Sequence, residues 1–291
     1  MKKLAGIGLG LFLSIAAFAQ PGWNYEGLTP AQQEEAQTKM VTMGDDVNAN
    51  RFEDAAKKTD WLVENCPKVH KSLYQNGAKA YDGMVDKTTG DLQSEYEDKT
   101  LMMYDKRIEY FGQEANVLNR KGQKAWVFWK DRPEKTEELF NLYKKIFEMN
   151  GKDTYAPNTV AYMDMACKMK SEGKLTDEQV MEVYDNVNTV LDANNEDKYE
   201  KMREPIEGLL AGCVTVDCGF VKDNLEPKFK AEPEIKLAKK MFSLMSTGGC
   251  TDDPVFFELM EFIDSKEPSF GMKITMARKA KKADKYDLAL K

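Results

Sequence analysis

Histidine is almost absent from this sequence of 291 residues, since His70 is the only one. A single imidazole excludes most serine–histidine triads and most histidine-ligated metal hydrolases. The motifs GxSxG, HExxH, GxGxxG and the P-loop are missing from any usable context, and no CxxC pair occurs. We therefore expect a protein with no catalytic residues, no cofactor and no metal site.

A net positive charge is absent, and long apolar runs are scarce. The formal net charge is −7, and the one basic run is short, at 278–282, so nucleic acid is not an expected partner. The one long apolar run, 4–18, follows Lys2 and Lys3 and is shorter than the roughly 20 residues that cross a bilayer. Ala-Phe-Ala at 17–19 fits the small-x-small rule for cleavage. This pattern predicts a signal peptide at 1–19, an exported mature chain in the periplasm or cell envelope, and no integral membrane span.

Strand-like alternation of β-branched residues is nearly missing, with 213–216 as its one short example. Apolar residues recur instead at helical steps of three and four. Helix-breaking asparagine, glycine and proline residues divide the chain about every 35 to 45 residues, which is the length of a helix–turn–helix unit. The clearest helical segments are 101–111, 139–149, 180–191 and 235–245.

Two pairs of segments repeat along the chain. NGAKAY at 76–81 matches KGQKAW at 121–126, and YDKRIEYFG at 104–112 matches YKKIFEMNG at 143–151. In the first segments, Gly77 and Gly122 each precede an alanine by three residues, so both small residues share a helical face on which a partner helix can approach. We expect each repeat to be a helical hairpin, with residues 82–95 forming an inserted polar loop.

The twelve residues 46–57 begin like a calcium-binding loop, with polar side chains at alternate positions. Such a loop needs glycine at its sixth position and a bidentate glutamate at its twelfth, where this chain has Arg51 and Lys57. Calcium binding is therefore rejected, and 48–51 is predicted to be a turn between two helices. The acidic pairs 45–46 and 252–253 are expected to cap helix starts rather than to form a glycosidase site.

The small residues, the aromatic-x-x-Ala turns at Phe52 and Tyr286, and the terminal proline at Pro67 resemble tetratricopeptide repeats, and more narrowly the exported tetratricopeptide proteins of Bacteroidota. The resemblance covers residues 45–291 and implies an all-α solenoid of helical hairpins, or superhelix, that holds other proteins or peptides. We assign 1–19 to the signal peptide, 20–44 to a leading helix and 45–291 to the repeat array. The turn signature at 282–290 starts a repeat that the sequence does not complete, which predicts a fragment of a longer protein or a final half-repeat.

In such an array, the residues one turn from the two packing glycines are expected to face the concave surface and bind a partner. Aromatic rings with polar tips, and amides that can bond a peptide backbone, suit a peptide ligand. The alternative is that Tyr81 and Trp126 pack between neighbouring hairpins. The candidate partner-binding residues are Tyr74, Tyr81, Asn119, Gln123 and Trp126.

In an exported protein, cysteines can form disulfides. We expect Cys218 to pair with Cys250, with Cys213 as the competing partner. Cys66 and Cys167 are expected to be buried free thiols.

The predicted function is an exported, non-catalytic scaffold that binds protein or peptide partners in its groove. The alternative is a carbohydrate-binding or outer-membrane uptake accessory that uses the aromatic cluster at 126–129.

Overall fold

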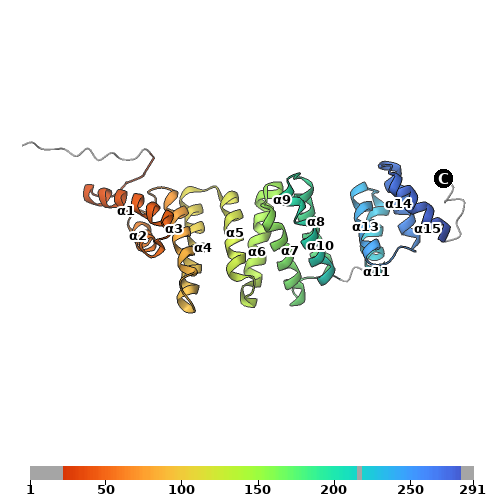
Figure 1. Ribbon diagram of the computed structural model, residues 1–291, viewed down its shortest axis with the longest axis horizontal. Coiled ribbons are helices and arrows are strands. Elements are labelled where there is room, and N and C mark those ends of the chain that lie inside the picture. The colour runs from red at the N-terminus through yellow and green to blue at the C-terminus, as the bar shows by residue number, and fades with distance from the viewer. Residues whose placement is uncertain (1–21, 215–217, 283–291) are drawn as a thin grey trace, which may run out of the picture. The chain divides into compact units, whose positions relative to one another are not determined.

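The computed structural model describes residues 22–214 and 218–282, and every regular element in these ranges is a helix (Figure 1). The chain forms two compact units, with the boundary between Asp131 and Arg132. Within each unit, helices that follow one another in the sequence pack side by side. The predicted all-α class of paired helices is confirmed. The signal peptide predicted at 1–19, and the turn signature predicted at 282–290 apart from Lys282, lie outside the described residues.

The first unit is built from helices joined by short turns. They are α1 (Pro30–Asn48), α2 (Phe52–Asn65), α3 (Ser72–Val85), α4 (Asp91–Phe111) and α5 (Glu114–Trp129). Helix α2 packs against α1 and α3, and α4 packs against α3 and α5. Because α1 continues to Asn48, it crosses the predicted boundary after residue 44 and forms the first hairpin together with α2.

The start of α1 is fixed by a reciprocal capping box. The hydroxyl of Thr29 accepts a hydrogen bond from the backbone N–H of Gln32, whose side-chain oxygen accepts from the backbone N–H of Thr29 at 3.0 Å. The same Thr-x-x-Gln arrangement begins a helix in the second unit, at Thr176 and Gln179. Each box satisfies two backbone donors that have no partner inside the helix.

The predicted turn at 48–51 joins α1 to α2. Asn50 adopts a left-handed conformation with φ of 56°, which asparagine tolerates better than most residues. The acidic pair 45–46 was expected at a helix start, but it lies in the last turn of α1, so that prediction is wrong. Buried Asp46 instead forms ion pairs with Arg51, at 2.6 Å, and with Lys58 of α2, and thereby ties the two helices together.

Glycine allows close helix packing at two positions of α3. A Cβ atom on Gly77 would lie 2.7 Å from Thr59 Cγ2 of α2 and 2.9 Å from Met103 Sδ of α4, in line with the predicted packing role. A Cβ atom on Gly83 would lie 2.3 Å from the ring of Phe52. The polar loop predicted at 82–95 is therefore mostly wrong, because α3 continues through Gly83 and the loop shrinks to 86–90.

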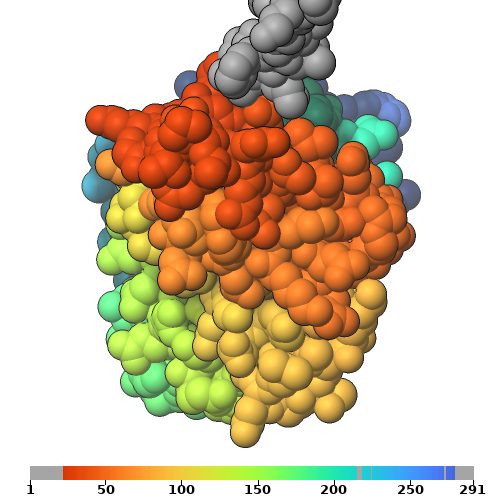
Figure 2. Space-filling model, turned by 90° about the vertical axis from the view of Figure 1, so that its left-hand side faces the viewer, coloured from red at the N-terminus to blue at the C-terminus, as the bar shows by residue number. Residues whose placement is uncertain are grey.

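The core of the first unit is continuous from α1 to α4. Its largest fully buried side chains include Met43, Leu62, Leu73, Tyr74 and Met103. Seen as spheres, the segments from α1 in red to α4 in yellow fit closely against one another (Figure 2). The helices of this unit are thus stabilised mainly by tertiary packing.

The second unit consists of helices of unequal length. They are η1 (Pro133–Lys135), α6 (Thr136–Asn150), η2 (Gly151–Asp153), α7 (Ala156–Ser171), α8 (Asp177–Asp192), α9 (Asp197–Glu200), α10 (Arg203–Cys213), α11 (Cys218–Phe220), the π-helical turn η3 (Val221–Leu225), α12 (Glu226–Ala231), α13 (Ile235–Thr247), α14 (Pro254–Lys266) and α15 (Phe270–Lys282). Helix α7 is central, since α6, α8 and α10 all pack against it. The prediction for the acidic pair 252–253 is confirmed at Asp253, whose carboxylate accepts from the backbone N–H of Val255 at the start of α14.

Candidate functional site

The two tyrosines predicted to line a groove lie in the core of the first unit. Tyr74 and Tyr81 are each only 1% exposed. The hydroxyl of Tyr74 donates to the carbonyl of Pro67 at 2.7 Å, and that of Tyr81 donates to Asp60 at 2.6 Å. Both phenols are therefore engaged inside the protein and not on an open surface, although Tyr74 also lines a cavity of the first unit. Their role in partner binding stays a prediction. For Tyr81, the alternative of packing between helices describes the structure.

The three candidates on α5 have different surroundings. Asn119 is buried, whereas Gln123 and Trp126 are half-buried. Lys130 Nζ lies 4.7 Å from the ring centroid of Trp126, in a cation–π contact. Of the cluster 126–129, only Val127 is well exposed, because Phe128 and Trp129 face the interior. The cluster therefore does not present a row of open rings on which sugars could stack.

A cavity of about 310 Å³ lies among α3, α4 and α5 of the first unit. Its lining is strongly cationic, with a single carboxylate among the described residues that line it. The residues that line it are Tyr74, Gln75, Asn76, Ala78, Lys79, Asp82, Tyr104, Arg107, Arg120 and Lys124. Of the predicted binding residues, Tyr74 alone is in this lining, and the cationic side chains were not predicted from the sequence. The available signal was Arg107, which lies four residues after Met103 and so shares its buried face of α4.

The second unit contains a cavity of about 340 Å³ between α6, α7 and α8. Tyr162 of α7 is at its base, with ring-centroid distances of 5.4 Å to Phe140 and 4.7 Å to Phe147. Exposed polar side chains of α6 and α8 form its rim, among them Lys144, Glu148, Gln179, Glu182, Asn186 and Thr189. Burial raises the pKa of Tyr162 to about 12, so its hydroxyl is protonated near neutral pH. We call this cavity the α6–α8 groove.

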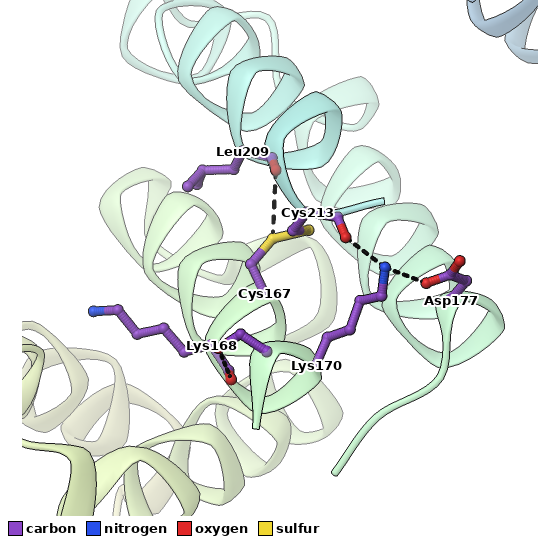
Figure 3. The surroundings of a disulfide bond; sticks show 7 residues. Cys167, Lys168, Lys170, Asp177, Leu209 and Cys213 are labelled. Atoms are coloured by element: carbon purple, nitrogen blue, oxygen red, sulfur yellow. Dashed lines mark hydrogen bonds and ion pairs between the residues drawn. A yellow bond between two sulfur atoms is a disulfide. The ribbon is translucent and has the colours of Figure 1, made fainter. Parts of the chain in front are cut away.

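Two disulfides are present, both in the second unit. One joins Cys218 to Cys250, the pair chosen from the sequence. The other joins Cys167 of α7 to Cys213 of α10, so the expectation that Cys167 is a free thiol is wrong (Figure 3). Their Cα atoms, 46 residues apart in sequence, are brought to 5.4 Å by the packing of α10 on α7, which sequence spacing alone does not reveal.

The surroundings of the Cys167–Cys213 bridge stabilise the end of α10. Lys170 Nζ donates to the backbone carbonyl of Cys213 and forms an ion pair with Asp177 at the start of α8 (Figure 3). A cation at the carboxyl end of one helix and a carboxylate at the amino end of another both match the helix dipoles. This cluster has the character of a structural junction between three helices.

Cys66, the remaining cysteine, is buried and free as predicted. Burial raises the pKa of the Cys66 thiol to about 11, which keeps it protonated and weakly reactive near neutral pH. His70 lies just before α3, where its Nδ1 accepts from the backbone N–H of Ser72, and burial lowers its pKa.

No three of the histidine, cysteine, aspartate and glutamate side chains in the described chain gather as ligands for a metal ion. Within the same residues, no helix combines the length and hydrophobicity needed to span a bilayer.

No protein-family model matches the sequence, and a comparison with curated proteins finds no matching relative. The tetratricopeptide assignment therefore stays a prediction.

Proposed function

We propose that this protein is an exported, non-catalytic scaffold that binds protein or peptide partners through its helical hairpins, in the periplasm or at the cell envelope. The observation that carries the proposal is the α6–α8 groove, which combines an aromatic base with a polar rim. Ligand sites of this kind draw affinity from apolar contacts and orientation from a few polar groups.

The shape of the groove favours a peptide over a compact metabolite. Its rim residues on α8 extend from Gln179 to Thr189, which corresponds to about 15 Å at 1.5 Å per helical residue. An extended peptide of about four or five residues covers this distance at about 3.3 Å per residue. The amide of Asn186 offers both donors and an acceptor to a peptide backbone, whereas Gln179 offers its N–H donors, because its oxygen accepts from the backbone N–H of Thr176.

The charges on the rim are balanced. Lys144 and Lys152 stand near Glu148 and Glu182, so neither sign dominates. This arrangement suits a partner segment of mixed or neutral charge that buries an apolar side chain against Phe147 and Tyr162. The two disulfides support the exported location, because such bonds persist in oxidising compartments.

The proposal is tested by selecting peptides from a displayed random library on the purified chain and measuring their affinity. Asn186→Ala removes an exposed rim amide and should weaken selected peptides about fivefold to tenfold, as expected for loss of one or two hydrogen bonds. The matched control is Asn141→Ala on α6, an exposed asparagine outside the groove, which should leave the affinity unchanged. A chain that selects no peptide, or peptides insensitive to Asn186→Ala, contradicts this use of the groove.

A glycan array separates this function from carbohydrate binding. Under the scaffold proposal, the wild-type protein binds no glycan on the array. Specific glycan binding that is lost on Trp126→Ala would replace the scaffold proposal with the carbohydrate alternative.

A further inference from the structure

The cationic cavity of the first unit contains a buried arginine without a counter-charge. Arg107 is only 7% exposed. Its Nη2 donates to the side-chain oxygen of Gln113 at 3.3 Å, and its Nε has no hydrogen-bond partner among the described residues. No carboxylate of the described chain forms an ion pair with this guanidinium. A buried charge in such a position is costly, because both its hydration and its pairing are lost.

The surroundings of Arg107 increase this excess of positive charge. Four cationic side chains line the cavity, and the single carboxylate, Asp82, is held by Lys124 at 2.6 Å. Burial and the nearby charge of Arg120 both lower the pKa of Arg107. Since the chain as a whole carries a charge of −7, this cavity is opposite in sign to the protein that contains it.

The cavity lining contains polar groups of the kind that bind an oxyanion. The guanidinium of Arg107 presents donors in a fixed fork, which suits two oxygens of one anion. The amides of Gln75 and Asn76 and the phenol of Tyr104 add neutral donors on the same lining. A dianion compensates more of the surplus charge than a single carboxylate does. The volume of about 310 Å³ also leaves room for a small substituent on the anion.

We propose that the cavity between α3, α4 and α5 binds a doubly charged tetrahedral oxyanion, a phosphate or sulfate group, on Arg107 and Arg120. This site is separate from the α6–α8 groove and does not depend on the scaffold function. A variant that abolishes binding at one of the two sites should therefore leave binding at the other unchanged.

Isothermal titration calorimetry on the purified full chain at about pH 8 tests this site, with sulfate, inorganic phosphate and acetate as probes at constant ionic strength. Sulfate, phosphate or both should bind, and the anion that binds identifies the group. Acetate should bind at least about tenfold more weakly. Arg107→Gln should weaken the better anion about tenfold or more, because a charge-assisted fork is lost.

Two further variants keep the test decisive if Arg107→Gln fails to fold. Arg120 is exposed, so Arg120→Gln tests the site with little risk to the core, and it should also weaken binding severalfold. The matched control is Lys121→Gln on the same helix, because Lys121 pairs with Asp105 outside the cavity. The proposal is overturned if neither dianion binds, if acetate binds as tightly, or if Arg120→Gln and Lys121→Gln have equal effects.

Discussion

At the scale of single residues, several positions carry roles that their residue type does not announce. Gly83 was read from the sequence as part of a polar loop, yet it lets the ring of Phe52 pack directly on the backbone of α3. Asp46 resembled a calcium ligand or a cap, yet it joins α1 to α2 through Arg51 and Lys58. In each case the deciding partner lies on another helix, so local sequence could not supply it.

Gly83→Ala should destabilise the first unit. The new methyl group would lie 2.3 Å from the Phe52 ring, so the ring or the helix must move at a cost of about 1–3 kcal/mol. Gly44→Ala in α1 is the matched control, because its Cβ would find only Asn76 Nδ2 at 3.5 Å. That change should stabilise the unit by about 0.5–1 kcal/mol, as alanine favours the helix. Urea unfolding measures both effects, and a Gly83→Ala protein as stable as the wild type would contradict the packing described.

Asp46 should make the first unit sensitive to acid. Burial raises the pKa of Asp46, but hydrogen bonds and charge from Lys58 and Arg51 outweigh it, so the net pKa lies below the ordinary value of 3.8. A depressed carboxyl pKa contributes stability that is fully present above the unfolded-state pKa and is lost as the pH falls through the folded-state pKa.

The measurement for this prediction is the urea midpoint of the first unit between about pH 7 and pH 2. Asp46→Asn should lower the midpoint at neutral pH and flatten its decline below about pH 4, because the asparagine cannot titrate. Equal acid sensitivity in the variant and the wild type would show that other carboxylates govern the effect.

At the scale of helices, the sequence predicted which segments are helical better than it predicted where each helix ends or which helices it packs against. Apolar spacing located α4, α6, α8 and α13, because a helix that buries one face must repeat about every 3.6 residues. The loop at 82–95 was predicted from its polar residues, but tertiary packing keeps this segment helical up to Val85 and again from Asp91. The burial of Tyr74 and Tyr81 was missed because it too depends on which helices surround α3.

The disulfide between α7 and α10 gives a prediction at this scale. Cys167→Ser with Cys213→Ser should lower the stability of the second unit by up to about 4 kcal/mol, because the bridge closes a segment of 46 residues. Urea unfolding followed by far-UV circular dichroism measures the loss. Cys66→Ser is the control for cysteine replacement and leaves both bridges in place. A second unit that is as stable in the double variant as in this control would show that the packing of α10 on α7 does not need the bond.

At the scale of the whole molecule, the two units differ in how they are stabilised. Both disulfides belong to the second unit, and Cys66 is the single cysteine of residues 1–131. The four tryptophans show the opposite distribution, since Trp23, Trp61, Trp126 and Trp129 all precede Arg132. Tryptophan fluorescence therefore reports on the first unit, whereas far-UV circular dichroism reports on both.

This distribution predicts that a thiol reductant changes the urea unfolding curve followed by circular dichroism and leaves the curve followed by fluorescence unchanged. With reductant, part of the circular dichroism signal should be lost at a lower urea concentration, because the second unit loses constraints on its unfolded state. The fluorescence midpoint should stay unchanged, because no bond in the first unit is reducible. In the Cys66→Ser protein, the reductant should shift the circular dichroism midpoint by the same amount and leave the fluorescence midpoint unchanged, which excludes any contribution from the free thiol. If reductant shifted both midpoints by the same amount, the chain would unfold as one cooperative block, and the stability of the first unit would depend on the bridges of the second.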